Sequence, residues 1–126
     1  MRHRLQTALF NLGVSLLLAH ELDAMLRTEW VLLPVLKDMS SQSASWAFIY
    51  LHIPVALAVL YLGNAPNRGL REAFRGLTCG FLAVHAVIHY TLSDVPAYDF
   101  HHLLSQLLIY TAGLCGGAFL IVKLRS

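Results

Sequence analysis

The stretch Phe81-Leu-Ala-Val-His85-Ala-Val-Ile-His89-Tyr-Thr91 places two histidines inside a largely apolar run. Residues four apart are neighbours on the surface of an α-helix, so His85 and His89 share one helical face. The run is apolar enough to lie in a lipid bilayer, where an ionisable side chain is costly and usually functional. We therefore expect a protein built from membrane helices, with its functional site around this histidine pair.

The composition of the whole chain is typical of a membrane protein. Of the 126 residues, 57% are hydrophobic and 13% are charged, whereas soluble domains have about 25% charged residues. The mean hydropathy is +0.61. So few polar residues cannot cover a water-exposed globule, and we expect an integral membrane protein in contact with the bilayer. Lysine and arginine form no run interleaved with aromatic residues, so we expect no nucleic-acid partner.

Apolar runs separated by turn residues predict four membrane spans. The expected spans are residues 5–26, 46–63, 71–92 and 99–123. Turn-forming residues at 63–69 and 93–96 separate the last three. Pro54 lacks a backbone donor and should kink the second span beside His52. No small-x-small cleavage site precedes His20, so we expect the first run to be a retained span and not a cleaved signal peptide.

These spans predict an all-α fold, a single domain over residues 1–126 that forms an antiparallel four-helix bundle. Between the first two spans, residues 30–36 are too few to cross a bilayer, so this segment should lie in the membrane interface with Trp30 as its anchor. The polar run 40–45 should follow as a loop that ends in a helix cap.

Two pairs of glycines predict how the last two spans pack. Gly76 and Gly80 on the third span, and Gly113 and Gly117 on the fourth, have the spacing that lets membrane helices approach closely. The two spans should therefore close together in their inner half and leave room around the histidines in their outer half. The same glycine faces could also support oligomers.

The distribution of basic residues predicts the orientation. Basic residues gather at the two termini and at the second connection, and these are Arg2, Arg4, Arg68, Arg71, Arg75, Lys123 and Arg125. The third connection has Asp94 and Asp99 and no basic residue. The positive-inside rule places both termini in the cytoplasm and the first and third connections outside. We expect a multi-pass protein of the inner (plasma) membrane.

With this orientation, six of the seven histidines lie in the outer half of the bundle. They are His20, His52, His85, His89, His101 and His102. A histidine in a membrane helix can simply bond to a neighbouring helix or reach the interface. Six on one side, drawn from four helices, favour a functional site.

Metal binding is the chemistry that this set favours. His85 and His89 can chelate one ion through neutral imidazoles. The carboxylate of Asp23, three residues after His20, can either bind the ion or orient the His20 imidazole. The candidate ligands are His20, Asp23, His52, His85, His89, His101 and His102, with one of the last two expected to face the centre. Nitrogen and oxygen ligands favour Zn or Fe over Cu(I). The candidate ligands outnumber the four of a structural zinc site, which suits two ions or one ion with an open position. Glu21 or Asp23 could serve as general base.

Two resemblances agree with this interpretation. The pattern His20-Glu-Leu-Asp-Ala24, Glu29-Trp30, His52-x-Pro54, His85-x3-His89 and Phe100-His-His resembles a bacterial family of small four-helix membrane proteins of unknown function. This resemblance implies the architecture and offers no activity.

The second resemblance is to the histidine boxes of membrane fatty-acid hydroxylases and desaturases, which hold two irons. His85-x3-His89 and His101-His102 are similar to pieces of those boxes. The chain has no full H-x-x-H-H box, is about half the expected size, and places its histidines on the outer side. The resemblance therefore contributes chemistry by analogy only.

Four functions remain open at this point. The first is a metalloenzyme, either a hydrolase or an oxidase/hydroxylase, that acts on a lipid-like, amphiphilic substrate. The second is a non-enzymatic metal binder, such as a sensor or an accessory subunit. The third is an electron-transfer protein with a b-type haem held by two histidines. The fourth is a structural subunit whose histidines only bond to neighbouring helices.

Overall fold

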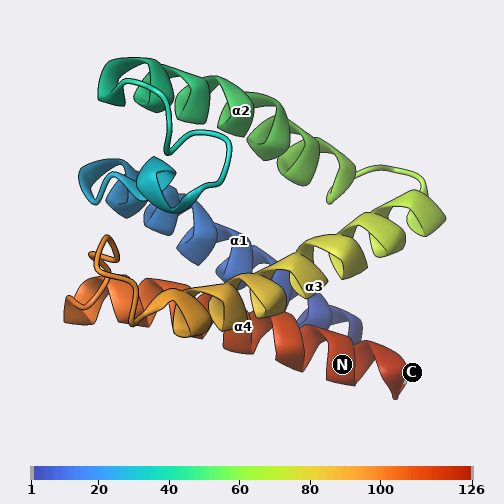
Figure 1. Cartoon of the computed structure of the whole chain (residues 1–126). Coiled ribbons are helices and arrows are strands. Elements are labelled where there is room, and N and C mark those ends of the chain that lie inside the picture. Colours follow the sequence, from blue (N-terminus) through green and yellow to red (C-terminus); the bar gives the residue numbers. More distant parts are fainter. Residues whose placement is uncertain (1, 126) are drawn as a thin grey trace.

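The computed structural model describes residues 2–125, which form four α-helices and one short 3₁₀ helix. These elements are α1 (Arg2–Leu26), η1 (Glu29–Leu32), α2 (Ser41–Leu62), α3 (Arg68–Leu92) and α4 (Leu103–Leu124). Successive α-helices run in opposite directions, so both ends of the chain lie at the same end of the molecule (Figure 1). The all-helical, four-helix architecture expected from the sequence is confirmed.

Three of the helices pack closely and the fourth stands apart. Helices α1, α3 and α4 share the interior, whereas α2 diverges from them along much of its length (Figure 1). The residues of α2 that are buried are Ala44 and Phe48. Most of its other large side chains are exposed, including Trp46, Tyr50 and Tyr61. In a bilayer, this outer face of α2 would meet lipid.

Helices α3 and α4 approach closely, but through only part of the glycine pattern that the sequence predicted. A Cβ added to Gly113 would lie 2.5 Å from the Cβ of Ala86, and a Cβ added to Gly116 would clash with the backbone of α3. Gly80 and Gly117 face open space instead. The close contact therefore uses Gly113 and Gly116, and association of several chains through the open glycine faces stays a prediction.

Three helices in the described part of the chain, α1, α2 and α4, are long and apolar enough to cross a membrane. Helix α3 has comparable length, but its first two turns carry the charged residues Arg68, Arg71, Glu72 and Arg75. The fourth span expected at 71–92 therefore stays a prediction.

Local hydrogen bonds shift several boundaries from those expected. Helix α2 begins at Ser41 because the Oγ of Ser40 accepts a hydrogen bond from the backbone of Ser43, so most of the predicted polar loop is helix. Helix α4 begins at Leu103, four residues later than expected.

Trp30, predicted to anchor in the interface, is only 6% exposed and packs its ring against Phe48.

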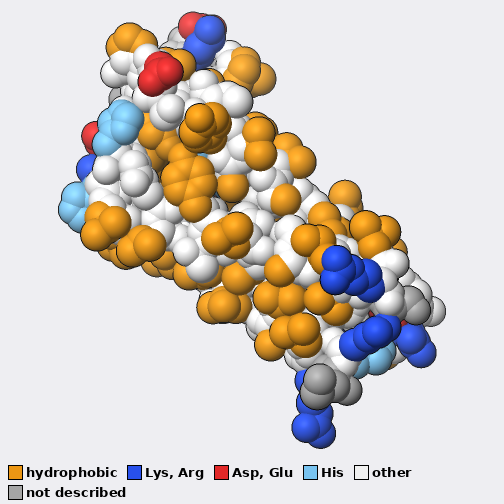
Figure 2. All heavy atoms as spheres, turned by 90° about the horizontal axis from the view of Figure 1, so that it is seen from below, with side chains coloured by type: hydrophobic (Ala, Val, Ile, Leu, Met, Phe, Trp, Pro, Cys, Tyr) orange, Lys and Arg blue, Asp and Glu red, His pale blue; other side chains and the backbone are white. Residues whose placement is uncertain are grey.

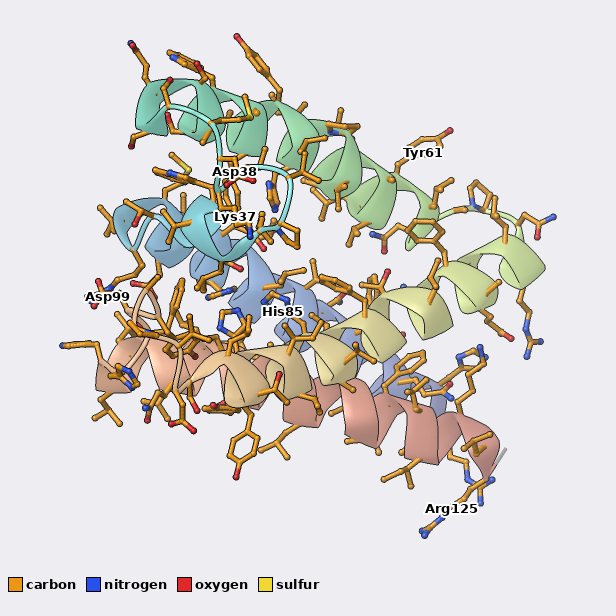
Figure 3. The ribbon with its side chains drawn as sticks, viewed as in Figure 1. Lys37, Asp38, Tyr61, His85, Asp99 and Arg125 are labelled. Carbon is orange, nitrogen blue, oxygen red and sulfur yellow. The ribbon has the colours of Figure 1, made fainter. Side chains whose placement is uncertain are left out.

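The two ends of the molecule differ in charge. Lysine and arginine gather where α1 and α3 begin and α4 ends, and we call this the basic end (Figure 2). Histidines and acidic side chains appear at the opposite end, which we call the histidine end (Figure 2). Arg125 and Asp99 mark these two ends (Figure 3).

Candidate metal centre

Three histidines and one glutamate converge between α1, η1 and α3. His20, Glu29, His85 and His89 each offer one ligand atom, and these four atoms lie within 4.8 Å of one another. His85 lies in the space between α3 and α1 (Figure 3). The side chains of His20 and His89 are almost completely buried, and that of Glu29 is nearly so. We call these four residues the His/Glu cluster.

The helical spacing and one sharp turn bring the cluster together. His85 and His89 lie one helical turn apart on α3, with ring centroids 4.6 Å apart. The ring of His20, from the end of α1, lies 5.1 Å from His85 and 5.0 Å from His89. Thr28 then takes a left-handed conformation with φ of 52°, which turns the chain after α1 and starts η1 at Glu29.

The Glu29 carboxylate lies between two of the histidines. Its Oε2 is 3.5 Å from His20 Nε2 and its Oε1 is 3.5 Å from His89 Nε2. Burial by itself would raise the pKa of Glu29, but the contact with His89 and the neighbouring histidines outweigh it and hold this pKa below its ordinary value. Glu29 therefore supplies a negative charge to the cluster.

Aromatic residues from the connection between α3 and α4 support the histidines from one side. The ring of Phe100 lies 5.5 Å from His20 and 5.0 Å from His89. The Nδ1 of His89 shares a hydrogen bond of 3.2 Å with the Tyr98 hydroxyl. Burial raises the pKa of Tyr98, so this hydroxyl stays protonated. When Nδ1 donates to that hydroxyl, the lone pair of His89 is on Nε2, which faces Glu29.

Several buried polar atoms of the cluster have no hydrogen-bond partner. They are Nδ1 and Nε2 of His20, Oε2 of Glu29 and Nε2 of His85. A buried polar atom without a partner typically costs about 1–3 kcal/mol, so native proteins rarely leave several together. Three imidazole nitrogens and one carboxylate oxygen are ligands for Zn or Fe. Such ligands lie roughly 2.0–2.2 Å from the ion, so small side-chain movements would let all four reach one ion.

Comparison with known proteins agrees with the resemblance found in the sequence. Residues 6–126 match the model of a family of unknown function, DUF6713. The chain belongs to the DUF6713 family. No curated protein and no solved structure matches it. The expected relationship to an uncharacterised family is therefore confirmed.

Of the seven predicted ligands, three meet in the cluster: His20, His85 and His89. His52 lies on α2, where its Nε2 is 3.0 Å from Oε2 of Glu21. Its Nδ1 donates a hydrogen bond of 2.6 Å to the carbonyl of Phe48. Glu21 and His52 therefore form a second polar pair outside the compact cluster.

The other predicted residues are directed elsewhere. Asp23 pairs with Arg27 at 3.5 Å, and Arg27 also contacts Asp99 at 3.4 Å. His101 and His102 are exposed. His102 caps α4, since its Nδ1 accepts a hydrogen bond from the backbone of Leu104. Because α4 begins only after these two histidines, no helical face turns either of them toward the cluster.

The fourth member of the cluster, Glu29, is not among the ligands that the sequence predicted. A usable signal was present, because Glu29 directly precedes Trp30 in a short apolar segment and belongs to the pattern that resembles the family. An acidic residue held in such surroundings requires a partner.

A cavity of about 230 Å³ adjoins the cluster. Its polar wall contains Glu21, Glu29, His52, His85 and His89, and the rest of its lining is apolar. A second, smaller cavity of about 120 Å³ shares Glu21, His52 and Phe81 with the first and is otherwise apolar. An apolar space with a few polar groups at one point is typical of a small-molecule site.

Proposed function

We propose that this DUF6713 protein is a membrane metalloprotein that uses the His/Glu cluster to act on a lipid-like substrate. The observation that carries the proposal is the meeting of four potential ligand atoms within 4.8 Å, several of them buried and without another partner. A bound metal would act as a Lewis acid that polarises a substrate oxygen or activates water.

The ligand set bears on which ion is held. A tetrahedral Zn²⁺ would be filled by three histidines and one glutamate, and such closed sites are structural. An ion with six positions, such as iron, would keep two for substrate or water. We therefore favour iron for the enzyme, and zinc for the alternative of a non-enzymatic metal binder.

The haem alternative receives no support from the geometry. Two histidines that ligate one haem must face each other from opposite sides of a porphyrin plane. The rings of His20, His85 and His89 instead contact one another directly, with centroids 4.6–5.1 Å apart.

The surroundings of the cluster favour an amphiphilic substrate. The 230 Å³ cavity gives a reacting group access to the cluster, and the apolar 120 Å³ cavity next to it suits part of a hydrocarbon chain. Helix α2 forms one side of both cavities and is largely exposed, so a substrate could enter from the bilayer beside it. We place the site in the outer leaflet of a bacterial inner membrane, on the basis of the basic residues at the opposite end.

Glu21 is the carboxylate that we assign as general base. It lines both cavities, and it faces His52 from α2. Asp23, the other carboxylate considered, is paired with Arg27 and lines neither cavity. In a two-metal site, Glu21 and His52 would instead be the residues that hold a second ion, since two ligand atoms 3.0 Å apart can occupy adjacent positions on one metal.

The test compares the metal-loaded protein with its Glu21→Gln variant in lipid nanodiscs that contain extracted bacterial lipids. We expect the wild type to consume one lipid class, detected by mass spectrometry, either only when O2 and a reductant are supplied, as for an oxidase/hydroxylase, or without them, as for a hydrolase. Removing a general base typically lowers a rate by about 10²–10⁴-fold, and Glu21→Gln should keep the metal of the His/Glu cluster. A metal-loaded wild type that changes no lipid would contradict the enzymatic proposal and leave the non-enzymatic binder.

Thr28 provides a separate prediction about how Glu29 reaches the cluster. Proline holds φ near −65°, so Thr28→Pro cannot adopt the left-handed turn and should move Glu29 away, with loss of most of the bound metal. Glycine takes positive φ without strain, so Thr28→Gly should keep the metal content of the wild type. Elemental analysis of both variants, with circular dichroism as the check on helix content, measures this. Equal metal in the two variants would refute the role of the turn.

A further inference from the structure

A third cavity lies at the basic end, far from the His/Glu cluster. It has a volume of about 360 Å³ and is formed where α1 and α3 begin and α4 ends. Its charged and titratable lining consists of Arg2, His3, Arg68, Glu72 and Lys123. Residues from three helices thus converge on one hollow that the metal chemistry does not use.

The charges around this cavity favour an anion. Arg2, Arg68 and Lys123 contribute three positive charges, and Glu72 is the one carboxylate in the lining. That carboxylate is already engaged, because Arg68 donates a hydrogen bond of 2.7 Å to it and His3 lies 3.9 Å away. The cavity therefore keeps an excess of two positive charges when His3 is neutral, and three when it is protonated.

Hydrogen bonds hold two of the basic groups at the cavity. Lys123 Nζ donates to the carbonyl of Glu72 at 2.9 Å, which ties the end of α4 to the start of α3. Arg2 donates to the carbonyl of Arg125 at 2.8 Å, which ties the start of α1 to the end of α4. The positive ends of the α1 and α3 dipoles add to the same field. The positive charge is therefore positioned by the fold.

The surroundings indicate where the anion comes from. The cavity lies at one end of helices that are long and apolar enough to cross a membrane. The ends of membrane-spanning helices lie at the depth of the lipid head groups. Apolar side chains lie on the surface beside the basic ones (Figure 2). Leu5 on α1, and Ile121 and Leu124 on α4, are among those exposed near this end. A molecule with a phosphate for the cavity and hydrocarbon for this surface is a phospholipid.

We propose that the cavity at the basic end binds the phosphate of an anionic phospholipid head group. Basic pockets between membrane helices on the cytoplasmic side are suited to such lipids. This proposal is independent of the proposed metal function, since its residues lie at the opposite end of the molecule. Helix content, followed by circular dichroism, serves as the check that each variant is folded, so this test does not depend on whether the protein binds a metal.

The experiment measures binding of short-chain phosphatidylglycerol to the whole chain in neutral detergent, with short-chain phosphatidylcholine and inorganic phosphate as comparisons. We expect phosphatidylglycerol to bind and phosphatidylcholine to bind at least about fivefold more weakly. Lys123→Gln should weaken phosphatidylglycerol binding about fivefold, the loss expected for one basic group, and Lys123→Arg should retain it. Lys37→Gln, an equal loss of charge at the histidine end, is the matched control.

Glu72→Gln gives a test that misfolding cannot mimic. Removal of the single carboxylate should tighten phosphatidylglycerol binding by about fivefold. The proposal is overturned if Glu72→Gln does not tighten binding, or if Lys37→Gln weakens it as much as Lys123→Gln does. Inorganic phosphate binding as tightly as phosphatidylglycerol would overturn the assignment to a lipid.

Discussion

His89→Ala should abolish metal binding, whereas His101→Ala should leave it unchanged. His89 is buried within the cluster, and its loss would remove one of four ligands. Changing the outer partner of a metal ligand typically lowers metal affinity about 10–100-fold, so losing a ligand itself should cost more than about 100-fold. Elemental analysis of protein purified in detergent should give about one metal ion per chain for the wild type and almost none for His89→Ala.

His101 is the matched control because it is an exposed histidine at the same end of the molecule. Its ring contacts Tyr98 but lies outside the cluster. If His101→Ala lost as much metal as His89→Ala, the ion would be held by exposed histidines or by the protein surface. If His89→Ala kept its metal, the cluster would have no role in binding it.

Removal of the metal should destabilise the wild-type protein strongly. A ligand present at about 1,000 times its dissociation constant stabilises the folded state by about 4 kcal/mol. For a chain of 126 residues, this corresponds to a fall in Tm of about 10 °C or more on treatment with a chelator. The loss should be large because the unpartnered atoms of His20, His85 and Glu29 are then left in the interior.

Thermal unfolding in detergent, followed by circular dichroism, measures this effect. Adding back iron or zinc should restore the original Tm, and the ion that restores it best identifies the preferred metal. The chelator should not change the Tm of His89→Ala, because that variant holds no metal to lose. An equal fall in Tm for both proteins would mean that the chelator acts elsewhere, and would contradict stabilisation through the cluster.

The sequence predicted the four α-helices and the last residue of each to within one position, whereas the predicted first residues differ from the observed ones by three to five positions. Long apolar runs separated by turn residues define helices whatever their neighbours do, so the four α-helices were found. The spacing of His85 and His89 fixes their shared face within one helix. The antiparallel order then brings His20, at the end of α1, to the same level as the end of α3.

The rest of the site depends on contacts that no periodic pattern encodes. Glu29 reaches the histidines because Thr28 adopts a left-handed conformation, and threonine gives no sequence signal for that conformation. His102 was expected on a helix, but its side chain caps the helix instead and stays outside the cluster. Because α4 begins four residues later than expected, His102 precedes the helix and does not lie on one of its faces.

The glycine contacts illustrate the same limit. The spacing of Gly113 and Gly117 indicated a helix contact. In the structure, Gly117 faces open space, and Gly113 and Gly116 are the glycines that contact α3. Which side of α4 meets α3 depends on rotation about the helix axis, and a stripe of small residues leaves more than one rotation available. The structure also shows α2 standing apart, which the apolar composition of that span did not predict.

The separation of α2 from the other helices has a dynamic consequence. All four residues of the His/Glu cluster come from α1, η1 and α3, and none from α2. A helix with few buried residues opens at a lower free energy than the closely packed part of the same protein. Fluctuations of α2 can therefore open the cavities while the geometry of the His/Glu cluster stays fixed, so that under the proposed function substrate exchange and metal retention would depend on different parts of one small fold.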